Sequence, residues 1–133
     1  MKNKSFFVFG IPLLVATLFL IGVTTAHAQE AKAFMGDWAG AVSVPGADID
    51  IICHFQLDAD GKLVGTIDSP SQGAYGLKLA NIKVEGTKIS FGVDDPNVPG
   101  DPRLEGTLDD TGTKISGDFS QGGSQGTFEL TKQ

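Results

Sequence analysis

Hydrophobic and polar residues alternate along most of the chain after Phe34, and no stretch there shows the apolar spacing of an amphipathic helix. Turn signals such as Pro45-Gly46 and Glu85-Gly86 separate the alternating segments, because glycine tolerates the positive φ of tight turns. The pattern predicts eight strands, at residues 37–44, 48–57, 62–68, 77–84, 87–93, 102–108, 113–119 and 125–131. Since the connections are short, strands that are neighbours in sequence should pair as antiparallel hairpins.

Four of these segments place a glycine in the middle of an apolar-x-Gly-x-apolar sequence, namely Gly40, Gly65, Gly106 and Gly117. Side chains alternate along a strand, so each glycine shares a face with its large apolar neighbours. A glycine in mid-strand costs roughly 0.5–1 kcal/mol relative to alanine, and its repeated use therefore needs a reason. Strong coiling of the sheet is one reason, and a hollow at mid-height is another. Both fit an all-β fold, an eight-stranded antiparallel up-and-down (lipocalin-like) β-barrel, whose interior is filled or holds one small ligand.

The fourth predicted strand departs from simple alternation. Leu77 and Leu79 share one phase, whereas Ile82 and Val84 share the other. A β-bulge near residues 80–81 would bring both pairs to the same face of the sheet.

The first 28 residues have the layout of a secretory signal peptide, with two lysines, an apolar stretch at residues 6–23 and the sequence Ala26-His27-Ala28. The alternative is a membrane anchor, since the apolar stretch approaches the spanning length of roughly 18–20 residues. Gly10 and Pro12 interrupt that stretch, which favours a cleaved signal. We therefore expect cleavage after Ala28, export to the periplasm or the medium, no membrane span afterwards, and a single barrel domain at residues 29–133.

The charge of the chain after cleavage limits its partners. Removing Lys2 and Lys4 leaves eight basic and sixteen acidic residues, a net charge of −8. Such an acidic surface argues against nucleic acid and anionic lipid as partners, and solubility explains it equally well. Cys53 is the only cysteine and falls in the apolar phase of its strand, so we expect a buried, unreactive thiol.

Residues 122–126 read GGSQG and match the G-x-S-x-G pattern of many serine hydrolases. That motif exposes its serine between a parallel strand and a helix, and the serine needs a histidine as base. Here Ser124 lies between two predicted β-strands, and His54 is the only histidine after cleavage. We therefore interpret the sequence as a hairpin loop and expect no enzymatic activity.

The sequence also contains no convincing pattern for a metal or cofactor site. The sequence DDPNVPGD at residues 94–101 offers oxygen ligands for calcium, but its spacing matches no calcium-binding loop, and a solvated loop explains it better. One histidine and one cysteine do not make a zinc site. We expect no cofactor.

Two loops have the composition of a binding site. DSPSQGAYG at residues 68–76 and SQGGSQG at residues 120–126 both carry Ser-Gln-Gly, and both follow strands that run in the same direction. They should share one rim of the barrel. The candidate ligand-binding residues are Ser69, Gln72, Tyr75 and Gln121 near this rim, with Trp38 low in the cavity. Alternatively, the glutamines bond backbone groups and hold the turns.

The motifs also resemble a known domain. They comprise G-x-W-x-G at residues 36–40, the Asp-Ser-Pro-x-Gln-Gly-Ala run at 68–74 and Gln-Gly-Gly at 121–123. This order resembles the β-rich domain found ahead of the catalytic domain in some secreted bacterial serine hydrolases of the α/β-hydrolase or β-lactamase-like classes. The resemblance implies the barrel fold, export and an accessory role, and it transfers no catalytic residue, because that domain does not carry the triad.

Two functions follow as expectations. The first is an exported, non-catalytic barrel that binds a small apolar or amphipathic ligand. The second is an interaction module that docks on a hydrolase or an envelope partner, which a contiguous exposed apolar patch would favour.

Overall fold

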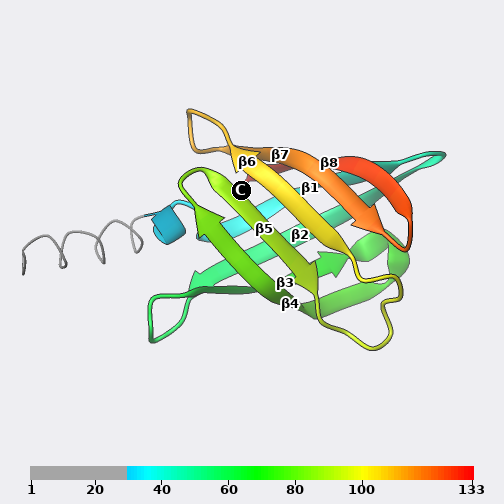
Figure 1. The fold of residues 1–133 in the computed structure, drawn as a ribbon, viewed down its shortest axis with the longest axis horizontal. Helices are drawn as coiled ribbons and strands as arrows, with labels where there is room; N and C mark the ends of the chain where they lie inside the picture. Colours follow the sequence, from blue (N-terminus) through cyan, green and yellow to red (C-terminus); the bar gives the residue numbers. More distant parts are fainter. Residues whose placement is uncertain (1–29) are drawn as a thin grey trace, which may run out of the picture.

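The computed structural model describes residues 30–133, which form a closed barrel of eight antiparallel strands (Figure 1). The elements are β1 (Gly36–Val44), β2 (Ala47–Leu57), β3 (Leu63–Ser69), the 3-10 turn η1 (Pro70–Gln72), β4 (Ala74–Glu85), β5 (Lys88–Val93), β6 (Arg103–Leu108), β7 (Lys114–Gln121) and β8 (Ser124–Lys132). Each strand pairs with its neighbours in sequence, and β8 pairs with β1 to close the sheet. The prediction of an eight-stranded up-and-down barrel is confirmed.

The signal peptide and cleavage site proposed at residues 1–29 lie outside the described residues. Between residues 30 and 133, no helix is long and apolar enough to cross a membrane.

The predicted bulge in β4 is present. The pairing of β4 with β5 shifts register between Ala80 and Lys83, and Asn81 adopts a left-handed backbone conformation with φ 53°. β4 begins three residues earlier than the alternation indicated. Ser69 pairs with Ala74 after the chain reverses through η1 and Gly73, whose φ is 67°.

The mid-strand glycines serve close approach between strands. A Cβ placed at Gly40, Gly65 or Gly117 would overlap a backbone carbonyl oxygen of the adjacent strand, from Glu129, His54 or Glu105 respectively. Strong coiling of the sheet therefore explains these three positions. At Gly106 a Cβ would lie 2.7 Å from the Phe128 ring and 2.9 Å from Ile115, so aromatic packing already occupies that space.

A hollow at mid-height, the other reason considered for these glycines, is not observed. The centre of the barrel holds three phenylalanine rings in edge-to-face contact. The centroids of Phe55 and Phe91 lie 5.5 Å apart, and those of Phe91 and Phe128 lie 6.5 Å apart. This geometry is favourable for aromatic pairs and leaves no room for a ligand between them.

The two ends of the barrel are built differently. At the closed end, a helical turn at residues 30–32 and the turn that follows it lie against the barrel and bury Phe34 completely (Figure 1). The indole Nε1 of Trp38 donates a hydrogen bond to the Phe34 carbonyl oxygen at 2.9 Å, and the Lys132 ammonium lies 5.7 Å from the centre of the indole ring. The open end carries the connections at residues 45–46, 70–73, 94–102 and 122–123, and a pocket lies there whose lining includes residues of the connections at 70–73 and 94–102.

Candidate functional site

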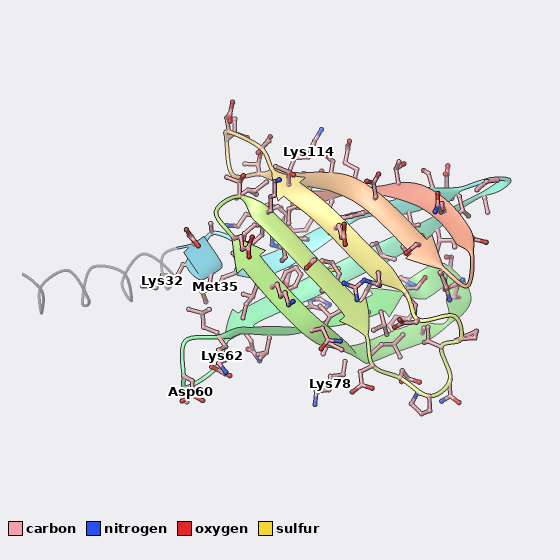
Figure 2. The ribbon with its side chains drawn as sticks, viewed as in Figure 1. Lys32, Met35, Asp60, Lys62, Lys78 and Lys114 are labelled. Atoms are coloured by element: carbon pink, nitrogen blue, oxygen red, sulfur yellow. The ribbon has the colours of Figure 1, made fainter. Side chains whose placement is uncertain are left out.

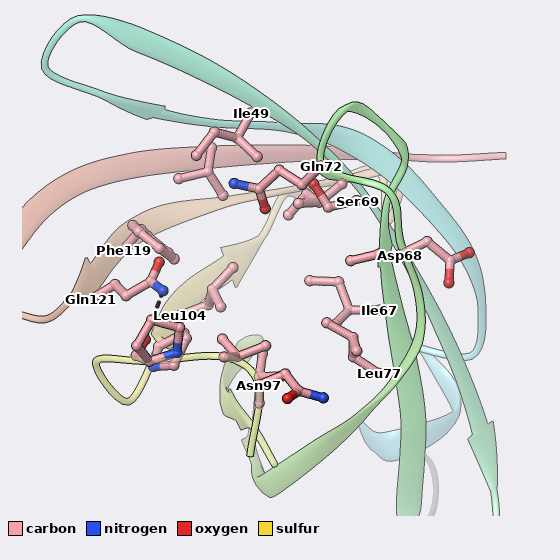
Figure 3. Close-up of a pocket in the computed structure, with 17 residues that line it drawn as sticks. Ile49, Ile67, Asp68, Ser69, Gln72, Leu77, Asn97, Leu104, Phe119 and Gln121 are labelled. Atoms are coloured by element: carbon pink, nitrogen blue, oxygen red, sulfur yellow. Dashed lines mark hydrogen bonds between the residues drawn. The ribbon is translucent and has the colours of Figure 1, made fainter. Parts of the chain in front are cut away.

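The pocket at the open end has a volume of about 410 Å³. Its deeper wall is apolar and consists of buried side chains from four strands, chiefly Ile51, Ile67, Leu104 and Phe119. Figure 3 shows Ile67, Leu104 and Phe119 around the cavity. Its volume and apolar lining are those of a small-molecule site. The pocket lies above the phenylalanine cluster, and none of the three rings is part of its lining.

The loop at residues 94–102 forms one side of the mouth and is fastened to the turn between β7 and β8. The side-chain Nε2 of Gln121 donates to the Pro99 carbonyl oxygen at 2.8 Å, and the backbone N–H of Gly122 donates to the Gly100 carbonyl oxygen at 2.7 Å. Gly100 has φ 80°, and a Cβ there would lie 2.8 Å from the Gly122 nitrogen. Glycine is therefore required at this contact by both conformation and space.

Sequence reasoning interpreted this loop as solvated and missed its part in the pocket. Val98 and Pro99 line the pocket, as does Pro102, which is buried. A valine and three prolines in an otherwise acidic loop are the signal that would have indicated an inward-facing side.

The loop at residues 68–76 forms the opposite side and is held on β2. The Ser69 hydroxyl donates to the Asp50 carbonyl oxygen at 2.9 Å, and the Ser71 N–H donates to the Asp50 carboxylate at 3.1 Å. The hydrogen bonds from Ser71 lower the pKa of Asp50. Ser69 is buried and lines the pocket, as predicted for a rim residue of this loop.

The two candidate glutamines both line the mouth, but they differ in their contacts. Gln121 holds the neighbouring loop through its Nε2, which leaves its Oε1 as a free acceptor. Gln72 is exposed, lines the pocket and has no side-chain hydrogen bond within residues 30–133; Figure 3 shows its amide projecting over the opening. The turn-holding alternative therefore applies to Gln121, and Gln72 remains available to a ligand.

Two predicted site residues lie elsewhere. Trp38 is completely buried at the closed end and is absent from the pocket lining, so its placement low in the ligand cavity is corrected. Tyr75 is 65% exposed and also absent from the lining. Its neighbour Ala74 lines the pocket, and alternation directs the following side chain to the outer face.

A chain of ion pairs lies on the outer wall of the barrel, beside the loop at residues 68–76, and consists of Asp37, His54 and Asp68. His54 Nδ1 is 2.7 Å from Asp37 Oδ1, and His54 Nε2 is 2.9 Å from Asp68 Oδ2. Asp68 also accepts a hydrogen bond from the Gly76 N–H at 2.6 Å. Asp37 first and Asp68 second raise the pKa of His54, while the Gly76 N–H and then His54 lower the pKa of Asp68.

The hydrolase motif has no catalytic surroundings in the described chain. Ser124 is the exposed first residue of β8, directly after the Gly122-Gly123 turn, and both ring nitrogens of His54 already face carboxylates. Cys53 is buried as predicted, and desolvation followed by the charge of Asp68 raises its pKa to about 12. Residues 30–133 contain no cluster of three or more potential metal ligands among histidine, cysteine, aspartate and glutamate.

The outer surface carries few large apolar side chains. In the described part of the chain, only Met35 and Tyr75 are exposed large hydrophobic residues, and they belong to opposite ends of the barrel. Comparisons of the chain with protein-family models, with curated proteins and with solved structures found no match. The resemblance to the hydrolase-associated domain stays a prediction.

Proposed function

We propose that this protein is an exported, non-catalytic β-barrel that binds a small apolar or amphipathic molecule at its open end. The observation that carries the proposal is the pocket itself, in which buried residues such as Ile51, Ile67 and Phe119 lie beneath a mouth bearing the unpaired amide of Gln72. Small-molecule sites typically combine a mostly apolar wall with a few placed polar groups. The export part rests on the signal-like pattern of residues 1–28.

The expected driving force is burial of the ligand's apolar part. Transfer of apolar surface from water contributes about 25 cal/mol per Å², so a ligand that fills the deeper wall gains affinity without a charged contact. Polar groups at the mouth then orient the ligand.

Titration with the uncharged fluorophore N-phenyl-1-naphthylamine tests the proposal. We expect saturable enhancement of its emission with one site per chain. Ala74→Phe places a ring in the pocket wall and should weaken binding at least about tenfold. Ala59→Phe, in the exposed turn at the closed end, is the matched control and should bind like the wild type.

Absence of saturable binding by the folded wild-type protein would overturn the proposal. Equal affinity of Ala74→Phe and wild type, with both variants folded by circular dichroism, would show that the probe binds outside this pocket and would equally overturn it.

A further inference from the structure

We propose that the pocket selects a molecule with an uncharged hydrogen-bonding head group and discriminates against its carboxylate counterpart. This inference rests on the proposed function, because it names the ligand class of the same pocket. Three independent features carry it: the side chains that line the pocket, the charges of the open-end connections, and the hydrogen-bonding capacity of the two mouth glutamines.

The lining provides no cationic group for an anion. Within residues 30–133, no lysine, arginine or histidine lines the pocket, and Asp68 is its only ionisable residue. Figure 3 shows the Asp68 carboxylate turned away from the cavity, where it contacts His54 and the Gly76 N–H. A carboxylate that entered this pocket would lose its hydration and find no compensating charge, which is costly.

The negative charges of the open-end connections also repel an anionic ligand. Residues 44–50, 68–76, 94–102 and 121–125 contain six aspartates and no lysine or arginine. The nearest cations in sequence, Lys78 and Arg103, are exposed residues on the outer face of the strands, and Figure 2 shows Lys78 projecting away from the barrel.

Asp50 and Asp68 accept hydrogen bonds from the backbone of the loop at residues 68–76 and hold it in place. Hydrogen bonds lower the pKa of Asp50 and of Asp68, so both remain ionised well below neutrality. Their negative potential reaches an approaching ligand over roughly the Debye length of 8 Å at physiological salt. An anionic ligand is therefore repelled by these charges as it approaches, and it loses hydration without compensation once it is inside the pocket.

The mouth glutamines match an uncharged group instead. The Oε1 of Gln121 is free to accept a hydrogen bond, because its Nε2 donates to the Pro99 carbonyl oxygen, and Gln72 offers both a donor and an acceptor. A hydroxyl group both donates and accepts, so it satisfies both side chains. The pocket volume of about 410 Å³ lies within the range of small-molecule pockets, roughly 300–1,000 Å³, so it has room for a medium-length alkyl chain below the mouth. A primary alcohol of that length is the simplest representative.

Displacement of N-phenyl-1-naphthylamine tests this selection with three ligands that share one chain length. We expect 1-decanol to compete at least about tenfold better than decanoate at pH 7.5. We also expect it to compete better than decylammonium, because an ammonium in the pocket would lose its hydration while the one lining carboxylate, Asp68, is already engaged by His54 and the Gly76 N–H. Decanoate that competes within about threefold of decanol would overturn the inference while leaving the proposed function intact. Tighter binding of decylammonium, or failure of decanol to displace a bound probe, would also overturn it. No binding of the probe itself would instead reject the proposed function.

A charge-introducing variant gives the matched control. Gln72→Lys should bring decanoate within a few-fold of decanol, because it places a cation at the mouth. Gln125→Lys adds the same charge on the outer face of β8 at the same end, and it should leave the preference for decanol unchanged. If both lysine variants improved decanoate equally, the effect would be that of net charge, and selection inside the pocket would be rejected.

Discussion

The closed and open ends of this barrel use the same strands for opposite purposes. At the closed end the Phe34 ring is fully buried, and the Trp38 indole satisfies its polar atom on the Phe34 carbonyl. At the open end the corresponding space is a pocket of about 410 Å³. The connections at the open end carry amide and carboxylate side chains, whereas the closed end is filled by aromatic rings. A single sheet thus carries a tightly packed core and a cavity one above the other.

The two ends of the barrel also differ in their charged residues. The closed-end segments at residues 30–35, 57–63, 85–88, 108–114 and 131–133 contain six acidic residues and five lysines. Figure 2 shows Lys32, Asp60 and Lys62 together at that end. The open-end connections contain six aspartates and no lysine or arginine, so most of the excess negative charge of the described chain belongs to the open end. The excess of acidic residues is therefore concentrated at one end of the barrel, which a role in solubility alone does not require.

The largest expected difference between the ends is in stability. Phe34→Ala should lower the free energy of unfolding by about 3–5 kcal/mol, because it leaves a cavity in a fully packed region. Val98→Ala at the mouth should cost less than about 1 kcal/mol, since that half-buried side chain already borders open space. Urea denaturation followed by circular dichroism measures both. Similar losses for the two variants would contradict the division into a packed end and an open end.

A second change tests the region between the ends. Gly117→Ala should destabilise the barrel by about 2–3 kcal/mol, because the added Cβ meets the backbone of β6, which has little freedom to move. The adjacent exposed Ser116→Ala is the control and should change the unfolding free energy by less than about 0.5 kcal/mol. A neutral Gly117→Ala would show that the strands are not held at this separation and that coiling is not the reason for the glycine.

The smallest expected effect concerns the outer wall. His54 has a raised pKa, so the stability that its protonated form contributes is fully present below its unfolded pKa of about 6.5. That contribution is lost as pH rises through the folded pKa. Because the ring is 40% exposed, solvent screening limits it to at most about 1 kcal/mol.

The test compares the urea midpoint of wild type with that of His54→Ala at pH 5.5 and at pH 9. The wild type should have the advantage at pH 5.5 and lose it at pH 9. Gln56→Ala, on the same face of β2, should show no such pH dependence. An advantage that grew with pH would contradict protonation of His54 as its cause.

Much of this architecture was predictable because alternation and turn residues act locally. The phase change from Leu79 to Ile82 indicated the β4 bulge, and the shared direction of β3 and β7 indicated that Gln72 and Gln121 lie at one rim. The height of a residue inside a barrel depends instead on the stagger of strands that are distant in sequence, which alternation does not report. Trp38 was therefore assigned correctly to the interior and incorrectly to the ligand cavity.

Other features escaped prediction because they lie outside the strands. The helical turn ahead of β1 follows no alternating pattern, and its role depends on Phe34 reaching the barrel interior. The path of the loop at residues 94–102 depends on its bonds to Gln121 and Gly122, partners about twenty residues away. The filled centre could not be told from a hollow one, because glycine on the inner face is compatible with both.

The position of Trp38 also determines what fluorescence reports. It is the only tryptophan of the chain, and it is sealed at the end of the barrel opposite the pocket. Its emission should therefore shift to longer wavelength when the barrel unfolds and water reaches the indole, yet stay nearly constant when a colourless ligand enters the pocket. Folding and occupancy can thus be followed in one sample through two separate optical signals, the intrinsic indole and a probe bound at the mouth.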